Sequence, residues 1–434
     1  MRPGQRRPSP RLSADLARLR RDVEALAGIG RTPEGGVSRP AFSEAWEQAR
    51  RWLADRMRRA GLATRLDAAG NVIGRLGPRG PSVVTGSHID SVPNGGPLDG
   101  ALGVLAGLEC ARAFGEAGLV PPRALEVVAF ADEEGRFLDC LGSRAMTGQL
   151  GPADVRRAAD PEGKPLAAAM RAVGLDPDRV RAAARPAADF AAYVELHIEQ
   201  GPVLERRGVP IGIVEAIVGI AQADLRFRGR ADHAGTTPMT IRRDAFLGAA
   251  EFAVRARELV RARGTRHSRL TFGVVEVRPQ VPNIVPFEAR LRQELRDIAP
   301  ERLWRLAAGT RRLAARVARR RHLALEWQEV FRHRPVQLAP RLQGLIREVC
   351  RDRGLAALRL PSGAGHDAQI LAAVTEAGMI FVPSQGGRSH RPDERTAWPA
   401  LGRGVDVLLH TLHRLLFAPD PRLGRARRSH EEPR

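Results

Sequence analysis

The stretch SVVTGSHIDSVPNGGPLDG, residues 82–100, joins a short apolar run to a glycine-rich loop that carries ligand-type side chains. His88, Asp90 and Asp99 lie in this loop. Three further clusters follow along the chain: DEEG at 132–135, ELHIEQG at 195–201 and SHRPDE at 389–394. Any one of them could be a solvated turn or a paired core histidine. Four together, each at a strand end or in a polar loop, indicate two metal ions held by imidazole and carboxylate, and favour a hydrolase.

The segments around this stretch alternate between strand and helix patterns. Strands are predicted over residues 71–74, 82–85 and 125–131, and a mostly apolar helix over residues 101–117. Such alternation implies an α/β fold with a mostly parallel sheet covered on both faces. Ligands collect beyond the carboxyl ends of the strands in such sheets, and His88, Glu133 and Glu134 fall there. Near the N-terminus, Ser13 is predicted to cap a helix over residues 14–27.

The pattern changes near residue 217, which indicates a second domain inserted into the first. The order from there is strand, helix, two strands, helix and strand, as in a small open sheet with helices on one face. The pattern of the first domain resumes after about residue 334. We therefore predict a metal-binding catalytic domain formed by residues 13–216 plus 334–418, an inserted domain at 217–333, and disordered tails at 1–12 and 419–434.

The amino-acid composition limits the classes of function that the chain can have. The chain has 434 residues and a net charge of +21, which would suit nucleic-acid binding. However, Lys164 is the only lysine, the arginines are spread along the chain, and Tyr193 is the only tyrosine, so base-stacking side chains are scarce. We expect weak polyanion binding that falls steeply with salt, no specific nucleic-acid partner and no membrane segment. Three separated cysteines and the absence of a secretory signal at the basic start predict a cytoplasmic protein.

The motifs together resemble one family, the hydantoinase/carbamoylase amidohydrolases of the dinuclear-zinc exopeptidase superfamily. This family includes N-carbamoyl-L-amino-acid hydrolases and allantoate amidohydrolases. The resemblance covers about residues 13–416. It is carried by GSHIDSVPNGGPLDGALGVLAGLE, FADEEGRF, GSRAMTG, ELHIEQGPVLE, GRADHAGTTPM, VPNIVP, SGAGHDA and PSQGGRSHRPDE, in that order. It implies a catalytic α/β domain, an inserted α+β lid and dimerisation domain, and a homodimer.

The resemblance also implies roles at the metal site. Its metal ligands map to His88, Asp99, Glu134, His197 and His390, with Asp99 bridging two divalent ions. Zinc suits these ligands, as do manganese, cobalt and nickel. Glu133 is the expected general base, because it neighbours a ligand without being one. Asp90, two residues after His88, is expected to hold the His88 ring through its side chain.

The implied substrate contacts come mainly from the inserted domain. Arg296 would bind a substrate carboxylate, Asn283 belongs to the same motif, and His233 would stabilise the oxyanion, from a partner subunit or on lid closure. Gln222 is a polar substrate contact or else an exposed strand residue. Gly363 and Ala364 would line the pocket with main-chain groups, and His366 is expected to be structural or to lie behind the ligands. Phe287 stands where relatives have glycine, and its bulk could shift the strand that carries Arg296.

The expected activity is hydrolysis of the carbamoyl C–N bond of N-carbamoyl-L-amino acids, small substrates that carry a carboxylate. Allantoate amidohydrolase is the alternative, because it uses the same metals and arginine and differs in pocket shape. An aminoacylase or dipeptidase is a further alternative on the same site. A silent binding protein would lack a ligand or the base, and this chain keeps all of them.

Overall fold

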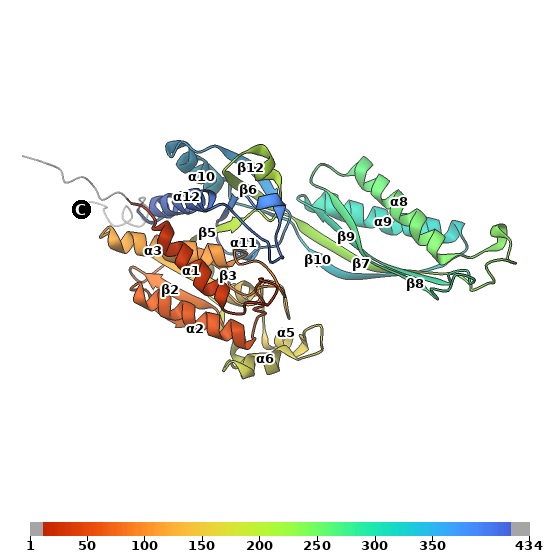
Figure 1. The fold of residues 1–434 in the computed structure, drawn as a ribbon, viewed down its shortest axis with the longest axis horizontal. Coiled ribbons are helices and arrows are strands. Elements are labelled where there is room, and N and C mark those ends of the chain that lie inside the picture. Colours follow the sequence, from red (N-terminus) through yellow and green to blue (C-terminus); the bar gives the residue numbers. More distant parts are fainter. Residues whose placement is uncertain (1–11, 418–434) are drawn as a thin grey trace, which may run out of the picture. The chain divides into compact units, whose positions relative to one another are not determined.

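The computed structural model describes residues 12–417 (Figure 1). The expected tails, apart from Leu12, therefore lie outside the described residues. The chain forms two compact units. The first contains the residues up to Glu215, Leu338–Leu360 and the residues from His366 onward; the second contains Ala216–Gln337 and Pro361–Gly365. None of the helices between residues 12 and 417 combines the length and apolar character that a membrane span requires.

A large mixed sheet organises the first unit. Its strands are β1 (Ala63–Leu66), β2 (Val72–Leu76), β3 (Ser82–His88), β4 (Ala124–Phe130), β5 (Phe190–Ile198), β6 (Ile211–Ile217), β11 (Val336–Gln337), β12 (Ala357–Ser362) and β13 (Ala377–Val382). Their order is β1-β2-β4-β3-β5-β13-β6-β11, with β12 on β6. The edge strand β11 and the last two residues of β6 and of β12 belong to the second unit. The central strands β4, β3, β5 and β13 are parallel, whereas the pairs toward both edges are antiparallel.

Helices cover this sheet. They are α1 (Leu16–Gly28), α2 (Glu44–Arg59), α3 (Ala101–Glu116), α4 (Leu141–Met146), α5 (Pro152–Arg157), α6 (Leu166–Ala172), α7 (Val203–Arg207), α10 (Pro340–Asp352), α11 (Asp367–Leu371) and α12 (Trp398–Phe417), with short 3-10 turns at Pro177–Ala183, Ala187–Asp189 and Gln385–Gly387. Helix α3 packs on β3, β4 and β5, and α12 packs on β5 and β13. Every residue of β3 and β4 is buried, including polar ones such as Thr85 and Glu126, as expected for central strands covered on both faces.

The first helix differs from its prediction. It begins at Leu16, and the side chain of Asp15, not of Ser13, accepts the capping hydrogen bond, from the N–H of Arg18 at 3.0 Å. The N–H of Asp15 in turn donates to Oε1 of the buried Glu109 at 2.8 Å. This tertiary contact, 94 residues away in the chain, fixes the start of the helix two residues later than local preference predicts.

The second unit is an antiparallel sheet with two long helices. Its strands β7 (Gly219–Arg228), β8 (Arg269–Arg278), β9 (Glu288–Asp297) and β10 (Ala324–His333) have the order β10-β7-β9-β8. Helices α8 (Ala245–Arg263) and α9 (Pro300–Arg320) pack on it, and a 3-10 turn occupies Met239–Ile241. In β7 and β9, alternate residues are buried. The expected α/β fold class, with a separate α+β part, is confirmed.

Candidate metal centre

The four ligand-type clusters meet at one edge of the large sheet. His88 is the last residue of β3, and His197 is the next-to-last residue of β5. Glu133 and Glu134 follow β4, and His390 follows β13. Strand β3 pairs in parallel with β4 and β5, and β5 pairs in parallel with β13. Because parallel strands end at the same edge of a sheet, their carboxyl ends bring these side chains together.

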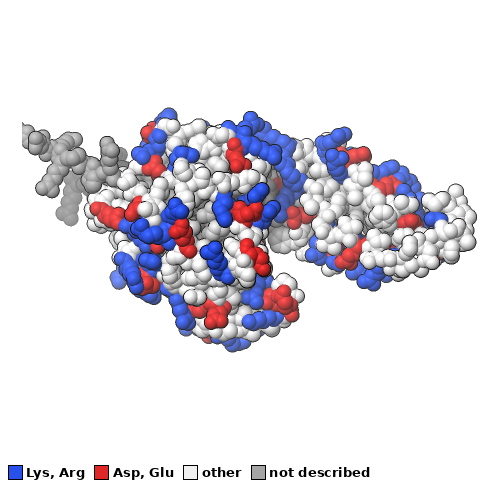
Figure 2. Space-filling model, viewed as in Figure 1, with Lys and Arg blue, Asp and Glu red and all other residues white. Residues whose placement is uncertain are grey.

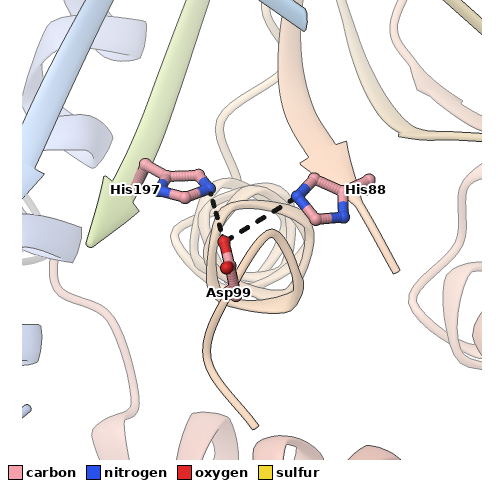
Figure 3. Close-up of side chains that lie close together, drawn as sticks. All are labelled: His88, Asp99 and His197. Atoms are coloured by element: carbon pink, nitrogen blue, oxygen red, sulfur yellow. Dashed lines mark ion pairs between the residues drawn. The ribbon is translucent and has the colours of Figure 1, made fainter. Parts of the chain in front are cut away.

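Asp99 lies at the centre of the cluster, just before α3. Figure 3 shows its carboxylate between the rings of His88 and His197. Oδ1 of Asp99 is 3.2 Å from Nε2 of His197 and 3.9 Å from Nε2 of His88. Oδ2 is 3.1 Å from Nε2 of His390 and accepts a hydrogen bond from Nε2 of Gln200 at 2.9 Å. One carboxylate therefore faces three imidazoles, the arrangement needed in a ligand that bridges two ions.

Main-chain carbonyl groups hold the rings of His88 and His197 on the side away from Asp99. Nδ1 of His88 lies 3.0 Å from the carbonyl oxygen of Asp90, and Nδ1 of His197 lies 2.9 Å from that of Ile198. Since a carbonyl oxygen only accepts, each ring has a proton on Nδ1, and in the neutral form that binds a metal Nε2 presents a lone pair. Nε2 of His197 faces a carboxylate oxygen, a contact that is repulsive for the neutral ring unless a proton or a metal ion lies between the two. Metal-binding histidines are oriented in this way.

Two further carboxylates complete the cluster. Oε2 of Glu134 is 3.7 Å from Nε2 of His390, and Oε2 of Glu133 is 3.4 Å from Nε2 of His88. The potential ligand atoms form groups within which all atoms lie within 4.8 Å of one another, including His88–Asp99–His197 and Asp99–Glu134–His390. These two groups share only Asp99. The structure thus brings together the five side chains that the sequence singled out as ligands.

Burial and crowding shift the pKa values of these groups. Burial, then the charge of Asp99, raises the pKa of Glu134 to about 8. Burial and Glu134 raise the pKa of Glu133 well above its usual value of 4.5. Burial lowers the pKa of His197, but the contact with Asp99 outweighs it and the result is about 9. In the protein alone, a bound proton relieves the repulsion among these crowded carboxylates. A divalent cation relieves it more strongly, because it carries more positive charge.

Unpaired buried atoms support a cation at this place. Oδ1 of Asp99 and Oε1 of Glu134 have no hydrogen-bond partner among residues 12–417. A buried carboxylate oxygen without a partner is costly, so the fold gains from an ion that binds it. Three imidazoles and two carboxylates suit zinc, and equally manganese, cobalt or nickel. The residues present therefore fit two divalent ions.

Asp90 contacts His88 through a different group from the one expected. Oδ1 of Asp90 lies 3.9 Å from Nδ1 of His88, too far for a hydrogen bond. The turn after β3 brings the main-chain carbonyl of Asp90 to the ring instead. Its carboxylate accepts a hydrogen bond from the N–H of Glu134 at 3.1 Å. The expected side-chain contact is thus corrected: the side chain of Asp90 holds the loop of Glu133 and Glu134.

In the second unit, Glu294 joins Gln222 to Arg296, and Arg296 in turn contacts Gly363. Nε of Arg296 donates to Oε1 of Glu294 at 2.7 Å, and Nε2 of Gln222 donates to Oε2 of Glu294 at 2.7 Å. Nη1 of Arg296 donates to the carbonyl oxygen of Gly363. The next residue, Ala364, donates its N–H to Oγ of Ser362 at 3.1 Å. Among the described residues Nη2 of Arg296 has no hydrogen-bond acceptor, so it can bind a ligand.

His233 and Asn283 lie together at a different place in the second unit. The N–H of Ala234 donates to the carbonyl oxygen of Asn283 at 2.9 Å, and His233 forms an isolated bridge with Ile284. His233 follows the last residue of β7, and Asn283 precedes the first residue of β9. Arg296 lies near the other end of these two paired strands. Eight residues of β9 separate Arg296 from Glu288, and His233 lies beyond that end, so at about 3.2 Å per residue at least roughly 25 Å separates His233 from Arg296. One small substrate cannot touch both within one copy of this unit.

Phe287 does not shift the strand that carries Arg296. Strand β9 pairs with β7 without a register break from Glu288 to Asp297. The N–H of Phe287 donates to the carbonyl oxygen of Arg278 at 3.1 Å, and its own carbonyl accepts from the N–H of Gly229 at 2.8 Å. The side chain is 37% exposed, so its bulk displaces nothing in the sheet.

Three polar side chains at the cluster were missed by the sequence reasoning: Glu195, Gln200 and Glu394. Gln200 donates a hydrogen bond to Oδ2 of Asp99. Oε1 of Glu394 accepts hydrogen bonds from the N–H groups of Leu98 and Asp99 at 2.9 and 3.1 Å. All three residues lie inside the motifs 195–201 and 389–394, and that position was the available signal. The ring of His366 is also here, with its centroid 4.6 Å from that of His197.

Comparison with known proteins places this architecture in a family. Residues 84–414 match peptidase family M20/M25/M40. The chain is 41% identical over 406 residues to an N-carbamoyl-L-amino acid amidohydrolase of Geobacillus stearothermophilus, covering 92% of this chain and 98% of the relative. It is 36% identical over 397 residues to an allantoate amidohydrolase of Escherichia coli, covering 90% and 96%.

A solved structure agrees with these relatives. The crystal structure of an amidase of the hydantoinase/carbamoylase family from Burkholderia multivorans superimposes with a TM-score of 0.88 at 33% identity, covering 95% of this chain and 100% of the other. The family match spans most of the chain, and the curated relatives match over nearly their full length. The chain therefore belongs to peptidase family M20/M25/M40, and its resemblance to the hydantoinase/carbamoylase amidohydrolases is confirmed.

Proposed function

We propose that this protein is a metal-dependent amidohydrolase that cleaves the carbamoyl C–N bond of N-carbamoyl-L-amino acids. The observation that carries the proposal is the double cluster around Asp99, in a chain 41% identical to an enzyme of that name. His88 and His197 would hold one ion with Asp99, and Glu134 and His390 would hold the other. Two such ions supply Lewis acidity and lower the pKa of a water held between them.

Glu133 is proposed as the general base. Its carboxylate lies beside the cluster, with Oε2 at 3.4 Å from Nε2 of His88, and is 8% exposed. In the reaction, Glu133 takes the proton of the attacking water and delivers it to the leaving nitrogen. Burial first, and Glu134 next, raise the pKa of Glu133 above its usual value of 4.5 in the metal-free protein.

His233 is proposed to stabilise the oxyanion. Its Nδ1 accepts hydrogen bonds from the N–H groups of Gly235 and Thr236 at 3.0 and 3.2 Å, so the proton of the neutral ring is on Nε2. That N–H can donate to the carbonyl oxygen of the scissile bond as negative charge develops there. Arg296 is proposed to bind the substrate carboxylate, with Gln222, Gly363 and Ala364 beside it and Asn283 beside His233.

The separation of His233 from Arg296 supports a homodimer. Because roughly 25 Å of β-strand lies between them, both can act on one substrate only if they come from different copies of the second unit. We therefore propose that residues 13–216 plus 334–418 form the catalytic domain and that residues 217–333 act as lid and dimerisation domain. The face drawn in Figure 2 carries both basic and acidic side chains.

Allantoate amidohydrolase activity is the second candidate, because one such enzyme is 36% identical over 397 residues. An aminoacylase or dipeptidase activity on the same site is the third. A panel of N-carbamoyl-L-amino acids, N-carbamoyl-β-alanine, allantoate and N-acetyl-L-amino acids separates them by the rate of ammonia or amino-acid release. The proposal expects N-carbamoyl-L-amino acids to have the highest kcat/KM, and expects Glu133→Gln to abolish turnover of all substrates. Preferred turnover of allantoate or an N-acetyl amino acid would replace it with the corresponding alternative.

A further inference from the structure

Glu195 is a buried carboxyl group that no proposed step uses. It lies near the middle of β5, two residues before His197, and is 1% exposed. Among the described residues, no lysine or arginine forms an ion pair with it. Burying a carboxyl group without a cationic partner is costly, and an apolar or amide side chain would avoid that cost. Pairing with an arginine or lysine therefore does not explain a glutamate at this position.

Its hydrogen bonds connect segments that carry the candidate ligands. Oε1 accepts from Oγ of Ser87 at 2.7 Å, and Ser87 directly precedes His88. Oε2 accepts from the hydroxyl of Tyr193 at 3.0 Å and from the N–H of Ala368 at 3.2 Å. Thus one side chain joins the end of β3, the strand β5 and the first turn of α11. Ser87 and Ala368 lie 108 and 173 positions from Glu195 in the chain.

A second buried glutamate of the same sheet shows the contrast. Glu126 on β4 is 2% exposed and is paired with two arginines, at 2.9 Å from Arg75 and 2.7 Å from Arg185. It also accepts a hydrogen bond from Ser82, the first residue of β3. Glu126 therefore belongs to a charge-balanced group at the start of the parallel strands. Glu195 has only neutral donors and lies toward the end where the ligands converge.

We propose that Glu195 is a positioning residue that sets the geometry of His88 and His197, and thereby the affinity of the ion held by His88, Asp99 and His197. It does so by fixing β3 against β5 directly behind the two rings. The ion held by Asp99, Glu134 and His390 depends on other segments and is affected less. This inference rests on the proposed metal-dependent function.

Glu195 also falls in a group with His197 and His366 whose potential ligand atoms lie within 4.8 Å of one another. A third ion there is the rival interpretation. Positioning is favoured because both oxygens of Glu195 already accept hydrogen bonds. A third ion would also have to draw His197 away from Asp99, which lies 3.2 Å from its Nε2.

The test is zinc binding by metal-stripped full-length protein, measured by competition with a chromophoric chelator. The variants are Glu195→Gln, which keeps the shape, and Ser87→Ala, a milder change that removes the link nearest His88. Glu126→Gln is the control for loss of a buried glutamate. We expect two successive dissociation constants in the parent protein. Loss of a partner behind the ligands should weaken one of them roughly 10- to 100-fold in Glu195→Gln, and less in Ser87→Ala. The other constant should change less than about twofold.

The unfolding temperature of each metal-free variant is measured in parallel, because a positioning role requires that metal affinity falls in protein that remains folded. Unchanged zinc affinities in folded Glu195→Gln and Ser87→Ala would overturn the inference, as would equal weakening in Glu126→Gln. Three tight zinc ions in the parent protein would replace positioning with direct ligation. If the parent protein binds no zinc tightly, the proposed metal-dependent function fails first, and this outcome is distinct from the others.

Discussion

Gly100 should tolerate no side chain, because it lies against the ring of a candidate ligand. It caps α3 with φ +62° and ψ −50°, a combination essentially restricted to glycine. A Cβ atom there would lie 2.4–2.5 Å from Cδ2, Nε2 and Cε1 of His88. Ordinary carbon contacts begin near 3.5 Å, so the ring would have to move by about 1 Å.

The cost of Gly100→Ala has two parts. The backbone strain contributes about 1–3 kcal/mol, and forcing a methyl group into a filled site contributes about 1–3 kcal/mol more. We therefore expect the free energy of unfolding to fall by roughly 2–6 kcal/mol. Metal–ligand distances tolerate only about 0.2 Å of error, so zinc affinity should fall more than the roughly 10- to 100-fold that follows loss of an outer hydrogen bond.

The assay is urea unfolding of the metal-free protein together with zinc competition. Gly115→Ala is the matched control in the same helix, because nothing lies within 4 Å of a Cβ placed there. It should leave zinc binding unchanged and raise stability by up to about 1 kcal/mol, the helix preference of alanine over glycine. Parent-like stability and zinc affinity in Gly100→Ala would refute the reasoning, since His88 would then not be fixed against this backbone.

Three further outcomes are expected. Arg296→Lys should raise KM roughly 10- to 100-fold with a small change in kcat, because lysine lacks the planar fork that binds a carboxylate; an unchanged KM in steady-state kinetics would exclude this contact. A hydrogen bond from Arg292, followed by one from Arg290, lowers the pKa of Asp224 from 3.8 to about 2, although burial opposes the shift. The stabilisation by the ionised Asp224 is therefore present above pH 4 and is lost as the pH falls toward 2. The difference in urea midpoint between Asp224→Asn and parent should therefore shrink from pH 5 to pH 2, and a constant difference would contradict the ion-pair account. Chelation should lower the unfolding temperature in calorimetry, because an ion at 100 times its dissociation constant adds about 2.7 kcal/mol per site; an equal temperature with and without chelator would exclude tight binding.

The five candidate ligands were named from the motifs together with their resemblance to one family, and the structure brings these side chains together. This was possible because each motif follows a strand, and parallel strands end at one edge. The alternation of strand and helix likewise predicted the fold class. The fold class and the candidate ligands could be predicted because both depend on short segments of sequence. Residues 82–100 alone contain His88, Asp90 and Asp99.

What the sequence did not reveal depends on contacts between distant segments. Glu195 meets Ser87 across 108 residues, and Glu394 meets Asp99 across 295. No local pattern specifies either contact. The atom of Asp90 that holds His88 also could not be predicted, because the spacing of the two residues suits the carbonyl and the carboxylate equally. The roughly 25 Å between His233 and Arg296 required the register of β7 with β9.

The most direct test of the account is ammonia release from an N-carbamoyl-L-amino acid by exhaustively chelated protein, followed as zinc, manganese or cobalt is added back. We predict no turnover before addition and a plateau at two ions per chain, with no recovery in Glu133→Gln. Full turnover by the chelated protein would contradict the account, because the cluster around Asp99 would then not carry the reaction.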